Sequence, residues 1–437
     1  MKNTLKILLT LSVIITCSKT SSQKYSDPVV SWALKNSQKI KTVELTENQN
    51  DLNLLGRIVG NAEVVCLGES RHDIHQQFKI KHRFIKYLVQ EMDFTTFVLE
   101  ASFPYSKVIN EYLLYGKGNL NNIMSDMPGW FLWDTHEMEE IFKWLREFNE
   151  NHNKDEKVKF YGIDIVAPNY ALDQIFKYLQ KTDKPYYDKI KNRNFARDII
   201  NDNNWPVSLQ RYSELSGKEK RILSDNYKDL MQHIKQNKNR YISRSSEVEY
   251  NWILELSYCA NEANKMFSEE DRFKMGLIRD NAMANITLWI KERNRKIIIW
   301  AHNVHIAKSE FTMNMFPDTP IKGMGYILNQ KLKDKMISIG ASFNQGEFQN
   351  ESRIFESAGS GTIDGTLARL NMNYFILNLK SKSANSEVEK WLNTRNNLRG
   401  QDFEMNCVPV KSFDAVYFTD KISKVNYNPE TLRKITN

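Results

Sequence analysis

Short, mostly apolar runs constrain the fold of this chain more than any other feature of its sequence. They lie at 64–67, 96–99, 158–163, 297–300 and 336–339, and they are continuous rather than alternating with polar residues. Runs of this kind are typical of strands buried on both faces of a parallel sheet. Helical spacing separates the first two runs, with Phe78, Ile85 and Leu88 on one face. This order predicts an α/β fold, in which a parallel or mixed central sheet is flanked by helices.

The middle of the chain has a different character. Residues 168–290 are polar and rich in Lys, Asn and Tyr, and they show helical spacing without a strand pattern. We therefore predict three folded parts. Residues 24–167 form the N-terminal half of an α/β core, residues 168–290 form a helical insertion, and residues 291–437 form the C-terminal half. The insertion is expected to form one wall of a cleft.

Composition excludes several other classes of protein. A hydrophobic fraction of 41% in 437 residues is enough for a sizeable core, so the chain is not disordered. The 61 Lys and Arg outnumber the 53 Asp and Glu, which gives a formal net charge of +8. The basic stretches alternate with polar or acidic residues and are typical of solvated helix faces, so we expect no nucleic-acid partner.

The first 23 residues have the pattern of an export signal. A basic start is followed by a mostly apolar stretch at 7–16, too short to span a bilayer, and then by Cys17. The residues around Cys17 also resemble a bacterial lipoprotein box, so both simple cleavage and lipidation of Cys17 remain open. We expect a bacterial protein that is periplasmic or attached to a membrane through Cys17 alone. Cys66, Cys259 and Cys407 are expected to be buried thiols, with one disulfide left open.

Acidic and histidine side chains follow the predicted strands where those strands end. The first run leads into Glu69 and His72, the second into Glu100, and the third into Asp164. The fourth leads into a stretch that contains two further histidines, His302 and His305. Ligands of open α/β sheets bind outside the carboxyl ends of the strands, so we expect these side chains to share one site.

Two chemistries fit this cluster. A histidine polarised by a carboxylate can take a proton from water, because imidazole titrates near neutral pH. Zinc is the alternative, with His72, His302 and His305 as ligands. The sequence contains no GxSxG, HExxH, P-loop or GxGxxG motif, which argues against a serine nucleophile, a helix-borne zinc site and nucleotide binding.

Structural interpretations compete with these functional ones. The two histidines after the fourth run fit satisfied polar groups in a turn, and Asp164 fits a helix cap. Trp130 and Trp133 fit either the core or a platform for a ligand. Arg279 and Asp280 are expected to open a helix, where an internal ion pair would explain them.

The motifs together resemble the erythromycin esterase family, which comprises macrolide-inactivating lactone hydrolases and their relatives. The similar segments run in the family's order across roughly residues 55–345, and they lie at 65–72, 97–100, 160–164, 278–283, 300–305 and 324–325. Six short motifs in one order are far more specific than any one of them.

The resemblance implies a carboxylic ester hydrolase that opens the lactone ring of macrolides such as erythromycin and so confers resistance. It places the general base on His72, supporting carboxylates on Glu69 and Glu100, and an oxyanion donor or leaving-group acid on His302 or His305. It implies no cofactor, and we expect a monomer. Lys81 falls where the family often carries Arg, which is a departure because Lys lacks the two-pronged donor geometry of Arg.

A bulky, mostly apolar substrate would need a wide cleft lined with aromatic side chains. The candidate substrate-binding residues are Lys81, Asp164, Trp130, Trp133, Tyr105 and Met324. Three alternatives stay open: an ester hydrolase with a different substrate, a metal-dependent hydrolase with the same cluster, and a non-catalytic surface lipoprotein that binds a glycan or partner.

Overall fold

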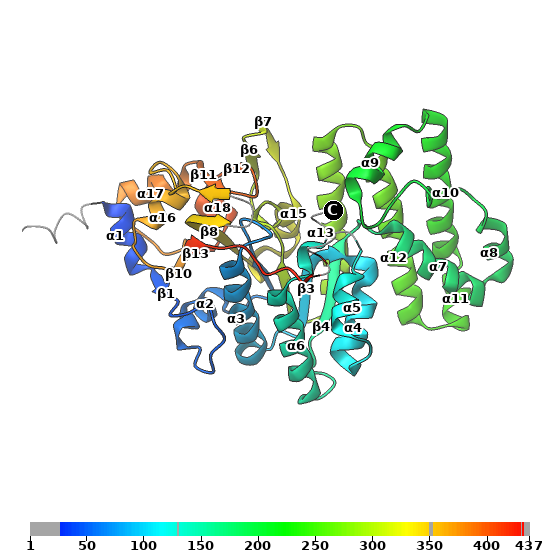
Figure 1. The fold of residues 1–437 in the computed structure, drawn as a ribbon, viewed down its shortest axis with the longest axis horizontal. Helices are drawn as coiled ribbons and strands as arrows, with labels where there is room; N and C mark the ends of the chain where they lie inside the picture. Colours follow the sequence, from blue (N-terminus) through cyan, green and yellow to red (C-terminus); the bar gives the residue numbers. More distant parts are fainter. Residues whose placement is uncertain (1–26, 129–130, 349–352, 430, 432–437) are drawn as a thin grey trace, which may run out of the picture.

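The computed structural model describes residues 27–128, 131–348, 353–429 and 431. The predicted export signal with Cys17, and Trp130, lie outside the described residues. The main element is a nine-stranded sheet with the strand order β1-β10-β13-β8-β2-β5-β3-β4, and β9 pairs with β8 (Figure 1).

The centre of this sheet is parallel and its margin is antiparallel. The parallel strands, in spatial order, are β13 (Ala415–Ile422), β8 (Met336–Phe348), β2 (Val64–Leu67), β5 (Ile297–Trp300), β3 (Thr96–Ser102) and β4 (Lys159–Asp164). The antiparallel additions are β1 (Ser37–Lys39), β10 (Tyr374–Asn378) and β9 (Arg353–Phe355). The predicted α/β fold with a mixed central sheet is therefore confirmed, and each of the five apolar runs lies in one of the parallel strands.

The apolar runs form strands because both faces of the sheet are covered. Successive residues of β2 point to opposite sides: Val64 and Cys66 belong to one hydrophobic core, and Val65 and Leu67 to the other. All four are fully buried. A run with apolar side chains at every position is the pattern that such a strand requires.

Helices cover the sheet on both faces (Figure 1). Those before β4 are α1 (Pro28–Lys35), α2 (Asn53–Val59), α3 (His75–Met92), α4 (Ser106–Tyr115), α5 (Leu120–Ser125) and α6 (His136–Glu150). Those after β5 are α14 (Asn303–Ile306), α15 (Met324–Leu332), α16 (Ile363–Ala368), α17 (Ser386–Asn393) and α18 (Pro409–Ser412). Helix α3 follows the expected spacing, burying Phe78, Ile85 and Leu88, and Asp93 ends it in the left-handed conformation with φ of 55°.

Between β4 and β5 the described chain is helical. The helices are α7 (Pro168–Thr182), α8 (Lys184–Ile190), α9 (Trp205–Ser213), α10 (Gly217–Gln236), α11 (Lys238–Arg244), α12 (Glu247–Ser268) and α13 (Arg272–Glu292). Figure 1 shows them gathered at the end of the molecule opposite α1, with α13 returning to the sheet. Arg279 and Asp280 lie inside α13, so the expectation that they open a helix is wrong. The helix begins earlier because Asp271 caps it, accepting from the main-chain N–H groups of Phe273 and Lys274.

A second, antiparallel sheet lies beside the main one. Its strands, in spatial order, are β11 (Asn396–Arg399), β12 (Glu404–Cys407), β6 (Phe311–Met313) and β7 (Phe316–Ile321). No pattern in the sequence predicted this sheet. The turn between β11 and β12 spans residues 400–403.

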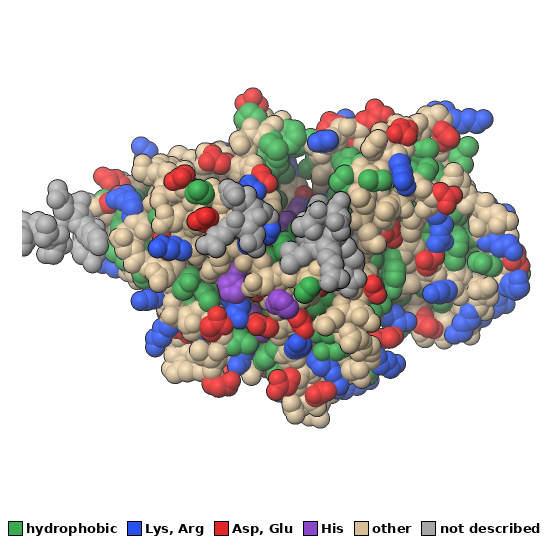
Figure 2. All heavy atoms as spheres, viewed as in Figure 1, with side chains coloured by type: hydrophobic (Ala, Val, Ile, Leu, Met, Phe, Trp, Pro, Cys, Tyr) green, Lys and Arg blue, Asp and Glu red, His purple; other side chains and the backbone are tan. Residues whose placement is uncertain are grey.

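The positive charge of the chain is dispersed over the visible surface. Figure 2 shows Lys and Arg interspersed with Asp and Glu rather than gathered in one patch of the visible face. In the described part of the chain, no helix is both long and apolar enough to cross a membrane. Cys66, Cys259 and Cys407 are all buried and unpaired there.

Candidate active site

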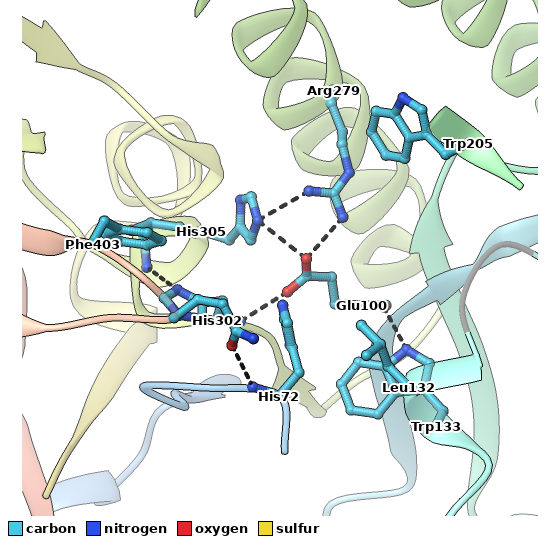
Figure 3. Close-up of a pocket in the computed structure, with 11 residues that line it drawn as sticks. His72, Glu100, Leu132, Trp133, Trp205, Arg279, His302, His305 and Phe403 are labelled. Atoms are coloured by element: carbon cyan, nitrogen blue, oxygen red, sulfur yellow. Dashed lines mark hydrogen bonds and ion pairs between the residues drawn. The ribbon is translucent and has the colours of Figure 1, made fainter. Parts of the chain in front are cut away.

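The strand ends bring the predicted acidic and histidine residues together. Strands β2, β5 and β3 are neighbours in the sheet, so the residues at their carboxyl ends share one edge. Glu69 and His72 follow β2, His302 follows β5, and Glu100 lies near the end of β3. Figure 3 shows the rings of His72, His302 and His305 arranged around Glu100.

A cavity of about 340 Å³ is lined by His72, Glu100, His302 and His305, among others. Figure 2 shows the surface hollowed between the β6–β7 hairpin and the helices that follow β4. The lining combines charged groups with apolar walls: His72, Glu100, Leu132, Trp133, Trp205, Arg279, His302, Val304, His305, Gln401 and Phe403. Its volume lies in the range of small-molecule sites, about 300–1,000 Å³.

His72 is held by a carboxylate from beneath the cavity. Its Nδ1 lies 2.6 Å from Oε1 of Glu69, whose side chain is fully buried. A carboxylate accepts, so Nδ1 carries the proton and Nε2 is the unprotonated nitrogen of the neutral ring. In Figure 3 the ring points toward Glu100, between His302 and Trp133. The arrangement presents an unprotonated nitrogen to the cavity.

Glu69 is in turn fixed by two buried donors. Nζ of Lys81 lies 2.5 Å and Nε1 of Trp300 2.6 Å from its Oε2. Burial opposes ionisation, but Lys81 and His72 hold the pKa of Glu69 at about 2. Lys81 also lies over the ring of Trp300, 3.5 Å from its centroid. Glu69 is therefore a rigid anion that orients His72.

The surroundings favour the protonated form of His72. Burial works to lower the pKa of its imidazole, but the hydrogen bond and charge of Glu69, with the charge of Glu100, raise it above the ordinary value of 6.5. A raised pKa makes the neutral form of His72 a stronger base.

Glu100 is the centre of a second buried network. Its Oε1 accepts from Nη2 of Arg279 at 2.8 Å and from Nε2 of His305 at 3.1 Å, while Oε2 accepts from the main-chain N–H of His302 at 2.9 Å. Its main-chain carbonyl accepts from Nε1 of Trp133 at 3.0 Å. Although Glu100 is buried, the charges of His305 and Arg279 hold its pKa well below the ordinary value.

His305 is a permanently charged member of this network. Its Nδ1 lies 2.7 Å from Asp280, and its Nε2 bonds Glu100. Against the effect of burial, these two carboxylates raise its pKa to about 10. Both nitrogens therefore donate to carboxylates at neutral pH.

His302 has the opposite character. Burial, with the neighbouring His72, lowers its pKa to about 3, so its ring is neutral. Its Nε2 lies 2.7 Å from the carbonyl of Ser70, and its Nδ1 accepts from the N–H of Val304 at 3.3 Å. In this structure both ring nitrogens are used to join the turn after β2 to the start of α14.

The ionic groups of the site nearly balance. The buried anions are Glu69, Glu100, Asp164 and Asp280, and the cations are Lys81, Arg279 and His305. Burial lowers the pKa of Lys81 to about 7 despite the charge of Glu69, so a count of charges does not fix the state of His72. The carboxylates of Glu69 and Glu100 are what favour its protonated ring.

The structure separates the candidate substrate-binding residues. Trp133 lines the cavity. None of the other described candidates does: Lys81 lies beneath Glu69, Tyr105 packs on Tyr170, and Met324 donates its N–H to Asp280.

Asp164 is also outside the lining. It bonds Arg279 through both carboxylate oxygens, at 2.6 to 3.1 Å, and caps no helix.

Two apolar lining residues, Leu132 and Val304, and four lining residues with charged, polar or aromatic side chains were not predicted from the sequence as parts of the site. Arg279 was interpreted as an internal partner of Asp280, but the two residues bind different groups. Trp205, Gln401 and Phe403 come from α9 and from the turn between β11 and β12. The feature of the sequence that could have identified Arg279 as a site residue was its charge within one of the segments similar to the erythromycin esterase family. The other three carry no local signal.

The histidines and carboxylates do not form a metal site as they are placed. Among the described residues, no group of three His, Cys, Asp or Glu side chains has an arrangement that could hold a metal ion. Both nitrogens of His302 and of His305 have protein partners, as does Nδ1 of His72. The donor set therefore fits hydrogen bonding better than coordination.

Comparison with known proteins identifies the family of this chain. The chain is 27% identical over 318 residues to the erythromycin esterase type II of Escherichia coli, covering 69% of this chain and 73% of that protein. It is 22% identical over 455 residues to the putative hydrolase YbfO of Bacillus subtilis, covering 95% and 98%. A solved structure of a mutant of the erythromycin esterase EreC, in its open conformation, has a TM-score of 0.71 at 15% identity and covers 90% of this chain and 99% of that one. A family model described as Erythromycin esterase matches residues 89–422. The protein therefore belongs to the erythromycin esterase family, a family of hydrolases.

Proposed function

We propose that this protein hydrolyses the ester bond of a macrolactone, with His72 activating the attacking water. The observation that carries the proposal is the pair formed by Glu69 and His72, which presents an unprotonated Nε2 to a cavity with aromatic walls. The names of the relatives support an ester as substrate, and the apolar side chains of Trp133, Trp205 and Phe403 suit a bulky apolar ring.

The reaction can be derived from the side chains on the cavity surface. Neutral His72 takes a proton from water as the oxygen attacks the ester carbon, and the protonated ring then gives that proton to the leaving alkoxide. One water is consumed, and the products are a carboxylate and a hydroxyl on one linear chain. Glu69 holds the ring in the required tautomer throughout.

The charged network positions a donor for the substrate. His305 is protonated, so it cannot accept from Nη1 of Arg279, which lies 3.2 Å from its Nε2. The N–H groups at Nη1 therefore remain for the ester carbonyl. Glu100 and Asp164 fix this guanidinium from the other side.

Mass spectrometry of erythromycin incubated with the purified mature protein tests the proposal. We expect a product heavier by one water, formed equally in the presence and absence of a chelator and absent with the His72→Ala variant. Loss of the product in the presence of the chelator would show that the reaction depends on a metal ion. If the wild-type protein forms no product, the macrolide is not its substrate, and this result would favour an ester hydrolase that acts on a different substrate.

The acid limb of the pH profile is expected to lie above the ordinary pKa of histidine. Activity requires neutral His72, so kcat/KM rises with pH through the pKa of this residue, which is raised above 6.5. Glu69→Gln removes the charge of Glu69, which raises this pKa more than the charge of Glu100 does, so the half-maximum moves to lower pH while the plateau falls. The profile is measured with protein shown to be folded by circular dichroism. A midpoint unchanged by Glu69→Gln would contradict the role of Glu69.

A further inference from the structure

The turn between β11 and β12 places a side-chain amide beside His72. Oε1 of Gln401 accepts from the main-chain N–H of His72 at 3.1 Å. Gln401 is half-buried and is one of the lining residues. A residue more than 300 positions away in sequence thus contacts the proposed base directly.

This hydrogen bond fixes which end of the amide faces the cavity. A main-chain N–H only donates, so the oxygen of Gln401 must point to it and the NH₂ group must point away. Nε2 of Gln401 has no hydrogen bond to any described residue of the protein. The amide therefore presents its N–H donors to the cavity, next to His72, the residue proposed to activate the attacking water.

The turn that carries Gln401 is held by a buried arginine. Arg71 is 1% exposed, and its Nη1 donates to the carbonyl of Gln401 and to Asp402. Its other N–H groups bond Asp73 at 2.8 and 2.9 Å. Arg71 precedes His72 in the chain, so one short segment fixes both the base and the amide. Such a preorganised donor does not have to reorient during the reaction, which is the condition under which it stabilises a transition state most.

The remaining polar groups of the cavity leave room for a second donor beside Arg279. His302 uses both ring nitrogens on main-chain groups, and His305 uses both on carboxylates. Arg279 comes from α13, so it and Gln401 reach the cavity from different elements. A tetrahedral intermediate develops negative charge on one oxygen, and oxyanion sites typically supply more than one donor.

We propose that Gln401 is a catalytic residue whose Nε2 donates to the oxyanion formed when water attacks the ester carbon. This assignment rests on the proposed ester hydrolysis. Removal of one such donor typically lowers kcat by about 10²-fold to 10³-fold. The effect falls on kcat, because the interaction strengthens only as the charge develops. KM of the variant is expected to stay within a few-fold of the wild-type value.

Two substitutions separate this role from mere positioning of His72. Gln401→Ala removes both the acceptor and the donor. Gln401→Glu keeps an oxygen for the N–H of His72 but replaces the donor by a second acceptor. We expect both variants to lose about 10²-fold or more in kcat, compared on the high-pH plateau because the added carboxylate raises the pKa of His72 further.

The matched control is Gln345→Glu. Gln345 lies in β8, is half-buried and also accepts through Oε1, from Ser357 at 2.8 Å, but it does not line the cavity. We expect its kcat to equal that of the wild type. Folding of each variant is checked by thermal denaturation.

The outcomes distinguish the assignment from the proposed function. Steady-state kinetics are measured with erythromycin and with an activated aryl acetate. Wild-type activity retained in Gln401→Glu but lost in Gln401→Ala would overturn the oxyanion role in favour of positioning. Wild-type activity in both variants would overturn any role for Gln401 in the reaction. An inactive wild-type protein with both esters would overturn the proposed hydrolysis, and the assignment with it.

Discussion

Replacement of His72 by Asn is expected to lower kcat by roughly 10³-fold to 10⁴-fold, toward the upper end of what a general base contributes. The asparagine amide can still donate to Oε1 of Glu69, as Nδ1 of His72 does at 2.6 Å, so the buried carboxylate keeps a partner. It has no nitrogen that accepts a proton from water. The effect therefore reports loss of the base rather than loss of the fold.

A second histidine–glutamate pair provides the control for this experiment. Nδ1 of His75 lies 2.5 Å from Oε1 of Glu137, and the His75 side chain is 25% exposed, close to the 19% of His72. His75 does not line the cavity. We expect His75→Asn to keep wild-type kcat. Turnover by His72→Asn within tenfold of the wild type would contradict the assignment of the base.

Replacement of Lys81 by Met is expected to lower the free energy of unfolding by about 3–5 kcal/mol, the usual cost of removing one partner of a buried ion pair. Both side chains of the pair of Lys81 and Glu69 are 0% exposed, with Nζ and Oε2 2.5 Å apart. The methionine fills most of the volume of the lysine stem. The loss therefore comes from a carboxylate left without its cation in a medium of low polarity. Urea denaturation measures it.

The double variant Lys81→Met, Glu69→Gln tests this physical reason. It removes both charges, so much of the lost stability is expected to return, although activity stays low because His72 loses its anion. An exposed pair serves as the control: Lys143 is 61% exposed and lies 2.6 Å from Glu139. Lys143→Met should cost no more than about 0.5 kcal/mol. A double variant less stable than Lys81→Met would contradict the explanation.

The sequence could predict the part of the site that depends on local pattern. The apolar runs identify the buried strands, and the carboxyl-end rule then places Glu69, Glu100 and His302 at one edge. That placement follows from topology alone, because β2, β5 and β3 are adjacent. The general rule needed no knowledge of which side chains bond one another.

The rest of the site depends on contacts that no local pattern encodes. Gln401 reaches His72 because β12, the partner of β11, also pairs with β6 far from it in sequence. A lone glutamine in a turn has no distinctive spacing. The difference between His302 and His305 is also invisible in the sequence. They lie in one short motif, yet burial among main-chain groups keeps one neutral, and two carboxylates from other elements keep the other charged.

The separation of the cavity walls from the reacting pair has a consequence for how this protein evolves. Glu69 and His72 come from one short turn after β2, whereas Trp205 belongs to the helices that follow β4 and Phe403 to the turn that follows β11. Mutations in the helices around Trp205 can reshape what fits without disturbing the reacting pair, whereas the turn of Phe403 also carries Gln401, which bonds His72. Descendants of one ancestral gene can therefore diverge in the compounds they degrade while the same histidine is inherited unchanged.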